Sequence, residues 1–71
     1  NMIKHIDRVY EILEVEQEAT KEQLLERCRE LKEKYEYIMD TTTDLRTQLK
    51  YQLKVIDVDD ARFFLKSPRF D

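Results

Sequence analysis

Apolar residues recur at helical spacing in three separate stretches of the chain. In the first stretch they lie three, four and three positions apart, at Ile3, Ile6, Tyr10 and Leu13. This spacing places them on one face of a helix, which we expect to run from about residue 3 to residue 13. Residues 15–19 break the pattern and predict a short loop.

The second stretch opens with a capping box. The Thr20 hydroxyl can accept a hydrogen bond from the Gln23 amide, and the Gln23 side chain can accept one from the Thr20 amide. Apolar side chains then follow at spacings of four, three, four and three, at Leu24, Cys28, Leu31, Tyr35 and Ile38. This seam predicts a helix that runs from residue 21 to about residues 37–39.

A polar stretch, Asp40-Thr41-Thr42-Thr43, predicts the loop that follows, because three consecutive β-branched residues resist helix continuation. We expect Thr43 to cap the third helix and Asp44 to lie in its first turn, where the helix dipole favours a negative charge. This helix is expected to span about residues 44–66 and to stop before Pro68.

The third helix is apolar on two nearly opposite sides. One side carries Tyr51, Val55, Val58, Ala61 and Leu65. The other side, which we call the outer stripe, carries Leu45, Leu49, Leu53, Ile56 and Phe63. Two arrangements are possible: the first helix or a kink covers both sides, or part of the outer stripe is exposed and binds another protein or a second copy of the domain.

The pattern as a whole predicts an all-α domain, in which a short first helix packs across an antiparallel hairpin of two long helices. A chain of 71 residues forms one domain with a small core. We expect that core to include Leu13, Leu24, Cys28, Leu31, Tyr35 and Leu65. The opening Asn1-Met2 resembles an expression remnant before a natural start methionine, so residues 1–71 are expected to be the N-terminal domain of a longer protein.

Composition excludes several classes of function. The chain has no glycine, so the glycine-rich loops that hold phosphates or dinucleotides are absent. The formal net charge of −3, from 13 basic and 16 acidic residues, argues against nucleic acid and anionic membranes as partners. No apolar run is long enough to cross a bilayer. A single cysteine cannot form an internal disulfide, which fits a reducing compartment and a cytoplasmic location.

The sequence contains no evident catalytic or metal-binding group of residues, so we expect neither enzyme activity nor a cofactor. His5 has no nucleophile at a suitable spacing and is expected in the first turn of the first helix, while Cys28 lies in the apolar seam. Asp57, Asp59 and Asp60 lack the glycine turn and distal glutamate of a calcium loop, and a helix points them to different sides.

A set of short motifs follows the three predicted helices in order. Near the start are Tyr10-Glu11-Ile12-Leu13-Glu14-Val15, Ala19-Thr20-Lys21-Glu22-Gln23-Leu24, Arg29-Glu30-Leu31 and Lys34-Tyr35. Near the end are Val58-Asp59-Asp60-Ala61, Leu65-Lys66-Ser67-Pro68 and Arg69-Phe70-Asp71. In this order the motifs resemble the J-domain of DnaJ-type co-chaperones, over residues 6–71. The resemblance implies a J-domain-like helical hairpin with a short first helix.

The chain departs from the J-domain pattern at the residues that carry the family's activity. The family's His-Pro-Asp tripeptide triggers ATP hydrolysis by a DnaK-type chaperone, but Glu36-Tyr37-Ile38 stands at its position. The usual glycine is replaced by Glu14. The basic face of the family's second helix is neutralised, because five cations are matched by five glutamates: Lys21, Arg27, Arg29, Lys32 and Lys34 against Glu22, Glu26, Glu30, Glu33 and Glu36.

The resemblance and its departures together imply a J-like protein–protein interaction or adaptor module that does not stimulate a DnaK-type ATPase. Two alternatives stay open: a divergent co-chaperone that still binds a DnaK-type chaperone, and a helical oligomerisation domain. The expected partner is a protein, either a DnaK-type chaperone or a second copy of the chain. The outer stripe is the candidate contact surface.

Overall fold

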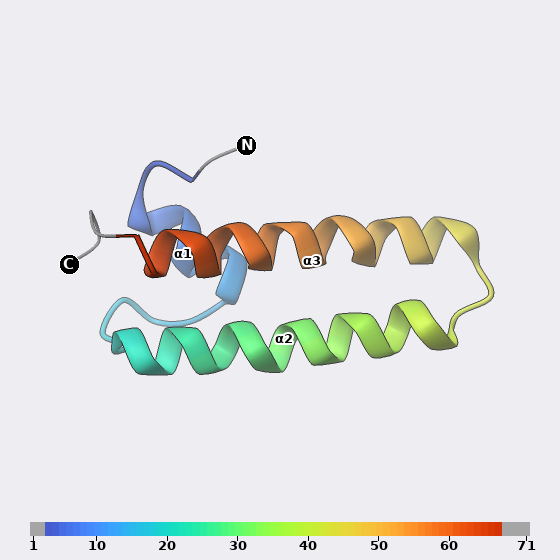
Figure 1. The fold of residues 1–71 in the computed structure, drawn as a ribbon, viewed down its shortest axis with the longest axis horizontal. Coiled ribbons are helices and arrows are strands. Elements are labelled where there is room, and N and C mark those ends of the chain that lie inside the picture. The colour runs from blue at the N-terminus through green and yellow to red at the C-terminus, as the bar shows by residue number, and fades with distance from the viewer. Residues whose placement is uncertain (1–2, 68–71) are drawn as a thin grey trace.

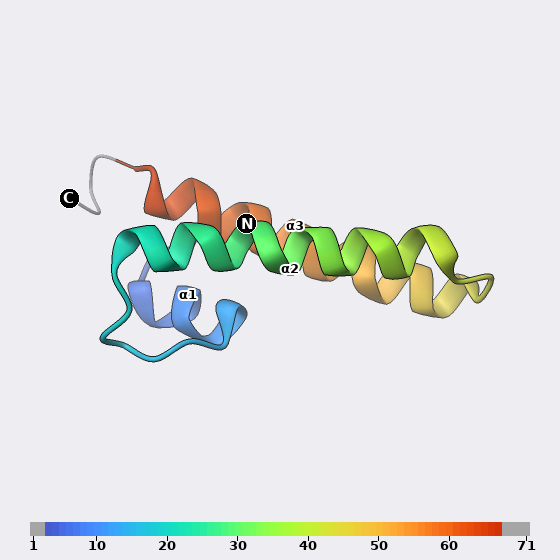
Figure 2. The ribbon, with the colours of Figure 1, turned by 90° about the horizontal axis from the view of Figure 1, so that it is seen from below.

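The computed structural model describes residues 3–67, and these residues form three helices and no strand. α1 spans Ile6–Leu13, α2 spans Lys21–Thr41 and α3 spans Leu45–Leu65. α2 and α3 run antiparallel as a long hairpin, and α1 packs against its end away from the connecting loop (Figure 1). The view from below shows α1 beside only one half of α2 (Figure 2). The predicted all-helical hairpin is therefore confirmed.

The core lies in the half of the hairpin that α1 covers. Nine apolar side chains from all three helices are at most 7% exposed: Val9, Leu13, Leu24, Cys28, Leu31, Tyr35, Val58, Ala61 and Leu65. They include the six side chains that the apolar spacing assigns to the core. The last of them in α2 is Tyr35 and the first in α3 is Val58, so no residue between these two is buried. Val55, on the same side of α3, is only half-buried.

The beginning of α2 is set by the capping box that the sequence predicts. The Thr20 hydroxyl accepts from the Gln23 amide at 3.1 Å, and the Gln23 side-chain oxygen accepts from the Thr20 amide at 2.8 Å. Two of the amides that a helix N-terminus leaves without intrahelical partners are thereby satisfied.

The predicted start of α1 at residue 3 is wrong. α1 begins at Ile6, because His5 has extended dihedral angles and its Nδ1 accepts from the Asp7 amide at 3.2 Å. His5 is therefore the N-cap and does not lie in the first turn. Ile3 still packs against the core as a half-buried residue ahead of the helix.

The predicted boundaries around the second loop are also wrong. α2 continues to Thr41: the Thr42 amide donates to the Ile38 carbonyl at 3.0 Å, and the Thr41 hydroxyl donates to the Tyr37 carbonyl at 2.8 Å one turn back, as a threonine hydroxyl can within a helix. The N-cap of α3 is Asp44 and not Thr43: its carboxylate accepts from the Thr47 hydroxyl at 2.6 Å and from the Thr47 amide at 3.0 Å. These two bonds lower the pKa of the Asp44 carboxyl.

α1 ends at a strained residue that is tied to α2. Glu14 adopts left-handed dihedral angles, φ 55° and ψ 48°, which glycine adopts at no steric cost. The neighbouring Leu13 carbonyl accepts from Arg27 Nε of α2 at 2.9 Å, and the Arg27 guanidinium lies 3.9 Å from the Glu14 carboxylate. Arg27 thus satisfies the end of α1 and fixes it against α2.

Beyond the buried Tyr35, the half of the hairpin nearer its loop is held by half-buried and exposed side chains. The rings of Tyr35 and Tyr51 pack with centroids 5.5 Å apart, and Lys54 Nζ lies 5.7 Å from the centre of the Tyr35 ring. Closer to the loop, the Gln48 side chain donates to the Met39 carbonyl at 3.3 Å. Aromatic, cation–π and polar contacts therefore hold α2 against α3 in this half.

α3 ends at Leu65, where the Lys66 amide donates back to the Arg62 and Phe63 carbonyls. Pro68, which we expect to stop this helix, lies outside the described residues, as do the motif Arg69-Phe70-Asp71 and the opening Asn1-Met2. Within residues 3–67, no helix combines the length and the apolarity that crossing a bilayer requires.

We predict that Leu31→Ala lowers the free energy of unfolding by about 2–5 kcal/mol, because Leu31 is only 2% exposed and its truncation leaves a cavity. Urea denaturation followed by circular dichroism measures this loss. The matched control is Leu45→Ala, which removes the same atoms from a side chain that is 66% exposed and should cost less than about 0.5 kcal/mol. An unchanged urea midpoint for Leu31→Ala would show that the seam is not the core.

Candidate interaction surface

The outer stripe of α3 is exposed along its full length. Its side chains are 48% to 68% exposed, and they are Leu45, Leu49, Leu53, Ile56 and Phe63. Of the two arrangements that the sequence allows, the structure therefore has the one in which neither α1 nor a kink covers the outer stripe. Five large apolar side chains on one helix remain in contact with solvent.

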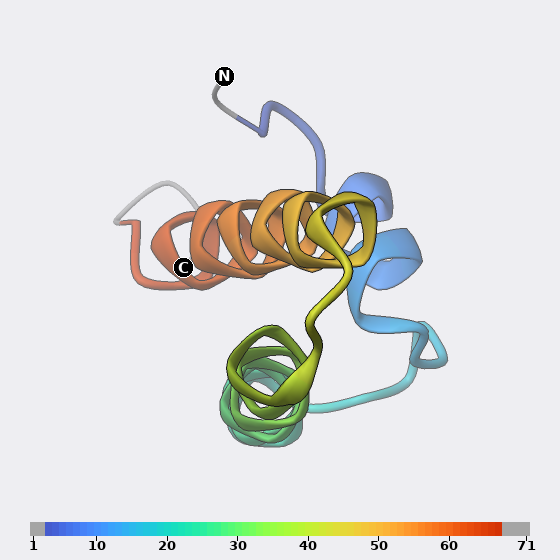
Figure 3. The same ribbon diagram turned by 90° about the vertical axis from the view of Figure 1, so that its right-hand side faces the viewer.

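The exposure of the outer stripe follows from where the other helices pack. At 3.6 residues per turn, the five side chains fall within a sector of about 80° that is roughly 27 Å long. Val58, Ala61 and Leu65 lie on the opposite side of α3 and face the core. The end-on view shows α1 and α2 against neighbouring sides of α3, while the remaining side has no helix on it (Figure 3). Because α1 and α2 both pack on the core side of α3, the side that carries the outer stripe has no helix over it.

Charged residues of opposite sign border the two halves of the outer stripe. Arg46 and Lys50 belong to the half nearer the loop, whereas Asp57 and Asp60 belong to the half nearer the C-terminus. Asp57 lies 3.8 Å from the Arg8 guanidinium of α1, so one of these carboxylates also helps to hold α1. The stripe is thus cationic at one end and anionic in its second half.

The three residues that the J-domain resemblance sets against the family's tripeptide lie inside α2. Glu36, Tyr37 and Ile38 follow the buried Tyr35 without a break, and the loop begins only after Thr41. Glu36 and Tyr37 are exposed, the latter by 69%, and Ile38 is half-buried. The segment carries no histidine and no proline, and its one carboxylate, that of Glu36, lies within the helix.

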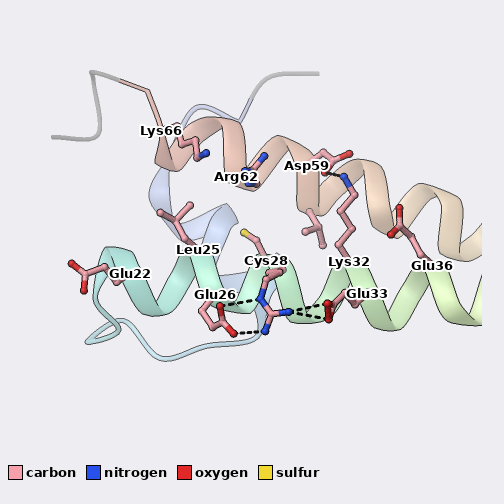
Figure 4. A pocket seen from close by; sticks show the side chains of 12 residues that line it. Glu22, Leu25, Glu26, Cys28, Lys32, Glu33, Glu36, Asp59, Arg62 and Lys66 are labelled. Atoms are coloured by element: carbon pink, nitrogen blue, oxygen red, sulfur yellow. Dashed lines mark hydrogen bonds and ion pairs between the residues drawn. The ribbon is translucent and has the colours of Figure 1, made fainter.

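A charged groove runs between α2 and α3 over the core (Figure 4). Its volume is about 550 Å³, and oppositely charged side chains line it. Lys32 Nζ lies 3.0 Å from the Asp59 carboxylate across the groove, while Arg29 donates to the carboxylates of Glu26 and Glu33 along α2. Since these charges neutralise one another locally, the groove offers no strong field for a charged substrate.

Cys28 lies beneath this groove, with its sulfur directed from α2 toward α3 (Figure 4). The residue is 1% exposed, and burial raises the pKa of its thiol; the nearby Arg62 opposes this rise and Asp59 adds to it. The thiol therefore stays protonated at neutral pH, and a protonated, covered thiol is a poor nucleophile.

Most cations of α2 already face carboxylates. Hydrogen bonds from Arg29 lower the pKa of the Glu26 carboxyl, and Glu26 together with Glu33 raises the pKa of the Arg29 guanidinium. The Arg27 guanidinium lies 3.8 Å from Glu30, besides its contact with Glu14. With Lys32 held by Asp59, the cations Arg27, Arg29 and Lys32 of α2 are each engaged with carboxylates of the domain.

The other candidate residues do not assemble into a site. His5 Nδ1 is used in the α1 cap, and the Asp7 carboxylate lies 3.4 Å from the same atom. Asp57 pairs with Arg8 of α1 and Asp59 with Lys32 of α2, so these two carboxylates point toward different helices. Across the described part of the chain, no three His, Cys, Asp or Glu side chains are arranged to hold a metal ion.

Comparisons with models of protein families, with curated proteins and with solved structures find no match to this chain. Sequence reasoning identified the apolar members of the outer stripe but missed Arg46 and Asp60, which lie on the same face. The signal was present: Arg46, Leu49, Leu53, Ile56, Asp60 and Phe63 alternate at spacings of three and four.

We predict that the Cys28 thiol of the folded domain reacts slowly with iodoacetamide at neutral pH. Only the thiolate reacts with iodoacetamide. Because the pKa of this thiol is raised, its thiolate forms at a higher pH than the thiolate of an ordinary cysteine does. Mass spectrometry of alkylation across a pH series measures the rate. The same chain in urea is the control, because unfolding exposes the thiol and restores its usual pKa. Equal rates at pH 7 for the folded and unfolded chains would contradict the burial of this sulfur.

Proposed function

We propose that this domain is a non-enzymatic protein–protein interaction module of J-like architecture, and that it binds its partner through the outer stripe of α3. The observation that carries the proposal is the exposure of five large apolar side chains on one face of α3, opposite the face that forms the core. Contiguous exposed apolar patches on soluble domains usually mark binding sites, because burial against a partner removes them from water.

The spacing of the outer stripe suits recognition by a helix. Leu49, Leu53 and Ile56 lie at positions i, i+4 and i+7, which is the pattern of anchors in helix-and-groove complexes. Complete burial of a fully exposed side chain of this size contributes about 1.5–3 kcal/mol, and these side chains are 48% to 68% exposed. Each anchor can therefore still contribute roughly half of that free energy when a partner covers it. A helical protein segment is therefore the class of partner that this face fits.

Two features of α2 support an interaction module that does not stimulate a DnaK-type chaperone. The helix has Glu36-Tyr37-Ile38 in place of the histidine, proline and aspartate of the J-domain tripeptide. Arg27, Arg29 and Lys32 already contact carboxylates of the domain, which weakens attraction to an acidic partner surface. The proposed binding therefore uses the apolar face of α3 and does not use a basic face of α2.

We predict that the double change Leu49→Glu with Leu53→Glu leaves the domain folded and abolishes partner binding. Both side chains are more than half exposed, so the new carboxylates stay in water in the free domain but would be buried in a complex. Circular dichroism melting tests the fold. A photo-crosslinking residue at position 56, introduced with and without the double change, tests binding in cells.

Lys34→Glu is the matched control for this experiment, because it makes the same change in net charge on the exposed side of α2. It should keep both the melting temperature and the crosslinked adducts. If the double change unfolds the domain, the outer stripe belongs to the core and the proposed function fails. Identical adducts from the folded double variant would show that binding occurs elsewhere.

We predict that the domain does not accelerate ATP hydrolysis by a DnaK-type chaperone in single-turnover assays, because the residues that trigger hydrolysis are absent at Glu36-Tyr37-Ile38. An authentic J-domain with the same chaperone provides the positive control. Stimulation of several-fold by the unmodified domain would instead favour a divergent co-chaperone.

A further inference from the structure

Resting on the proposed function of the outer stripe, we propose that its partner is a second copy of this chain, and that the two α3 helices pair antiparallel. The inference follows from the pattern of charge within the exposed face.

The exposed face of α3 has the repeat of a two-helix seam. Positions at alternating spacings of three and four are Arg46, Leu49, Leu53, Ile56, Asp60 and Phe63. Such a repeat is the pattern by which one helix packs against another in a coiled coil. The four apolar members are between 48% and 68% exposed, so the seam is available in the single chain. The first position of this seam is the cation Arg46, and the fifth is the anion Asp60.

These two charges distinguish the possible orientations of a second copy. In a parallel pair in register, Arg46 faces the partner's Arg46 and Asp60 faces the partner's Asp60, and like charges in contact repel. In an antiparallel pair with Leu53 opposite the partner's Ile56, Leu49 lies opposite the partner's Asp60. Arg46 then lies one layer of the seam away from the partner's Asp60, and the long arginine side chain can reach that carboxylate. Twofold symmetry forms this ion pair twice.

Both charges lack a partner within the described part of the domain. Among residues 3–67, neither the Arg46 nor the Asp60 side chain forms an ion pair or a hydrogen bond, although Asp60 is half-buried. By contrast, Asp57 and Asp59, its neighbours in α3, each pair with a cation on another helix. Antiparallel pairing therefore supplies counter-ions to the two seam charges that the fold leaves unmatched.

A second copy can reach this face without rearrangement of the domain. α1 and α2 occupy the other sides of α3, so the two α3 helices meet while both hairpins stay intact (Figure 3). The dimer would place four long helices side by side in the order α2, α3, then α3 and α2 of the second copy. Lys50, beside the seam, would lie near the partner's Asp57 and add a weaker contact.

Charge reversal with its compensating change tests the inference by sedimentation equilibrium. The unmodified chain should form dimers at micromolar concentration. Arg46→Glu places two carboxylates together in the antiparallel seam, and Asp60→Lys places two cations together; each should raise the dimer dissociation constant at least about tenfold. The double variant Arg46→Glu with Asp60→Lys restores opposite charges and should return the dissociation constant to near that of the unmodified chain. Thermal melts of dilute samples check that every variant is folded.

The alternatives give different results. In a parallel dimer, Arg46→Glu replaces one like-charge contact with another, so an unchanged dissociation constant would overturn the antiparallel orientation. A chain that stays monomeric at all concentrations would overturn self-association altogether. That result leaves the proposed function intact if position 56 still crosslinks to a different protein, whereas unfolding by Leu49→Glu with Leu53→Glu would remove the proposed function itself.

Discussion

The burial of one small apolar cluster by three helices governs the rest of this structure. Two helices alone cover a single side of each other, and Val58, Ala61 and Leu65 of α3 become fully buried only because α1 adds Val9 and Leu13 to the same cluster. The bond from Arg27 to the Leu13 carbonyl holds α1 in that place. Once α1 and α2 occupy their sides of α3, its remaining side has no partner within the domain, so the candidate interface is a consequence of the core.

Much of this fold could be predicted, because the buried positions repeat at helical spacing and a capping box marks the start of α2. The ends of the elements were harder, since neighbouring polar residues compete for the same cap. Thr43 and Asp44 are both good N-caps, and the choice of Asp44 depends on the contacts that its carboxylate makes with Thr47. The cap of α1 by His5 has no signal as distinct as the Thr20 capping box. Which residue caps a helix is decided by the hydrogen bonds that its side chain can form with the next few residues. The spacing of apolar residues carries no information about those bonds.

The candidate site was predictable in part, for a related reason. Two apolar sides of α3 were visible in the sequence, but which one stays exposed depends on where α1 packs. That placement depends on contacts such as the pair of Arg8 with Asp57 and the bond of Arg27 to α1, between residues far apart in the chain. The sequence pattern did not assign Arg46 and Asp60 to this face, because charged residues are expected everywhere on helix surfaces. Their position became informative only in three dimensions, where they lie on an exposed apolar face with no partner among residues 3–67.

The uneven distribution of buried side chains gives the hairpin a gradient of local stability. No side chain between Tyr35 and Val58 is buried, so this part should open by fluctuations that leave the α1 end intact, and its amide hydrogens should exchange faster. Leu49 and Leu53 lie in this weakly held part. A protein that covers them would add buried area where the hairpin has least, and the paired rings of Tyr35 and Tyr51 would pass the added order to α2. Occupation of one helix face would thus slow exchange on a helix that the partner does not touch.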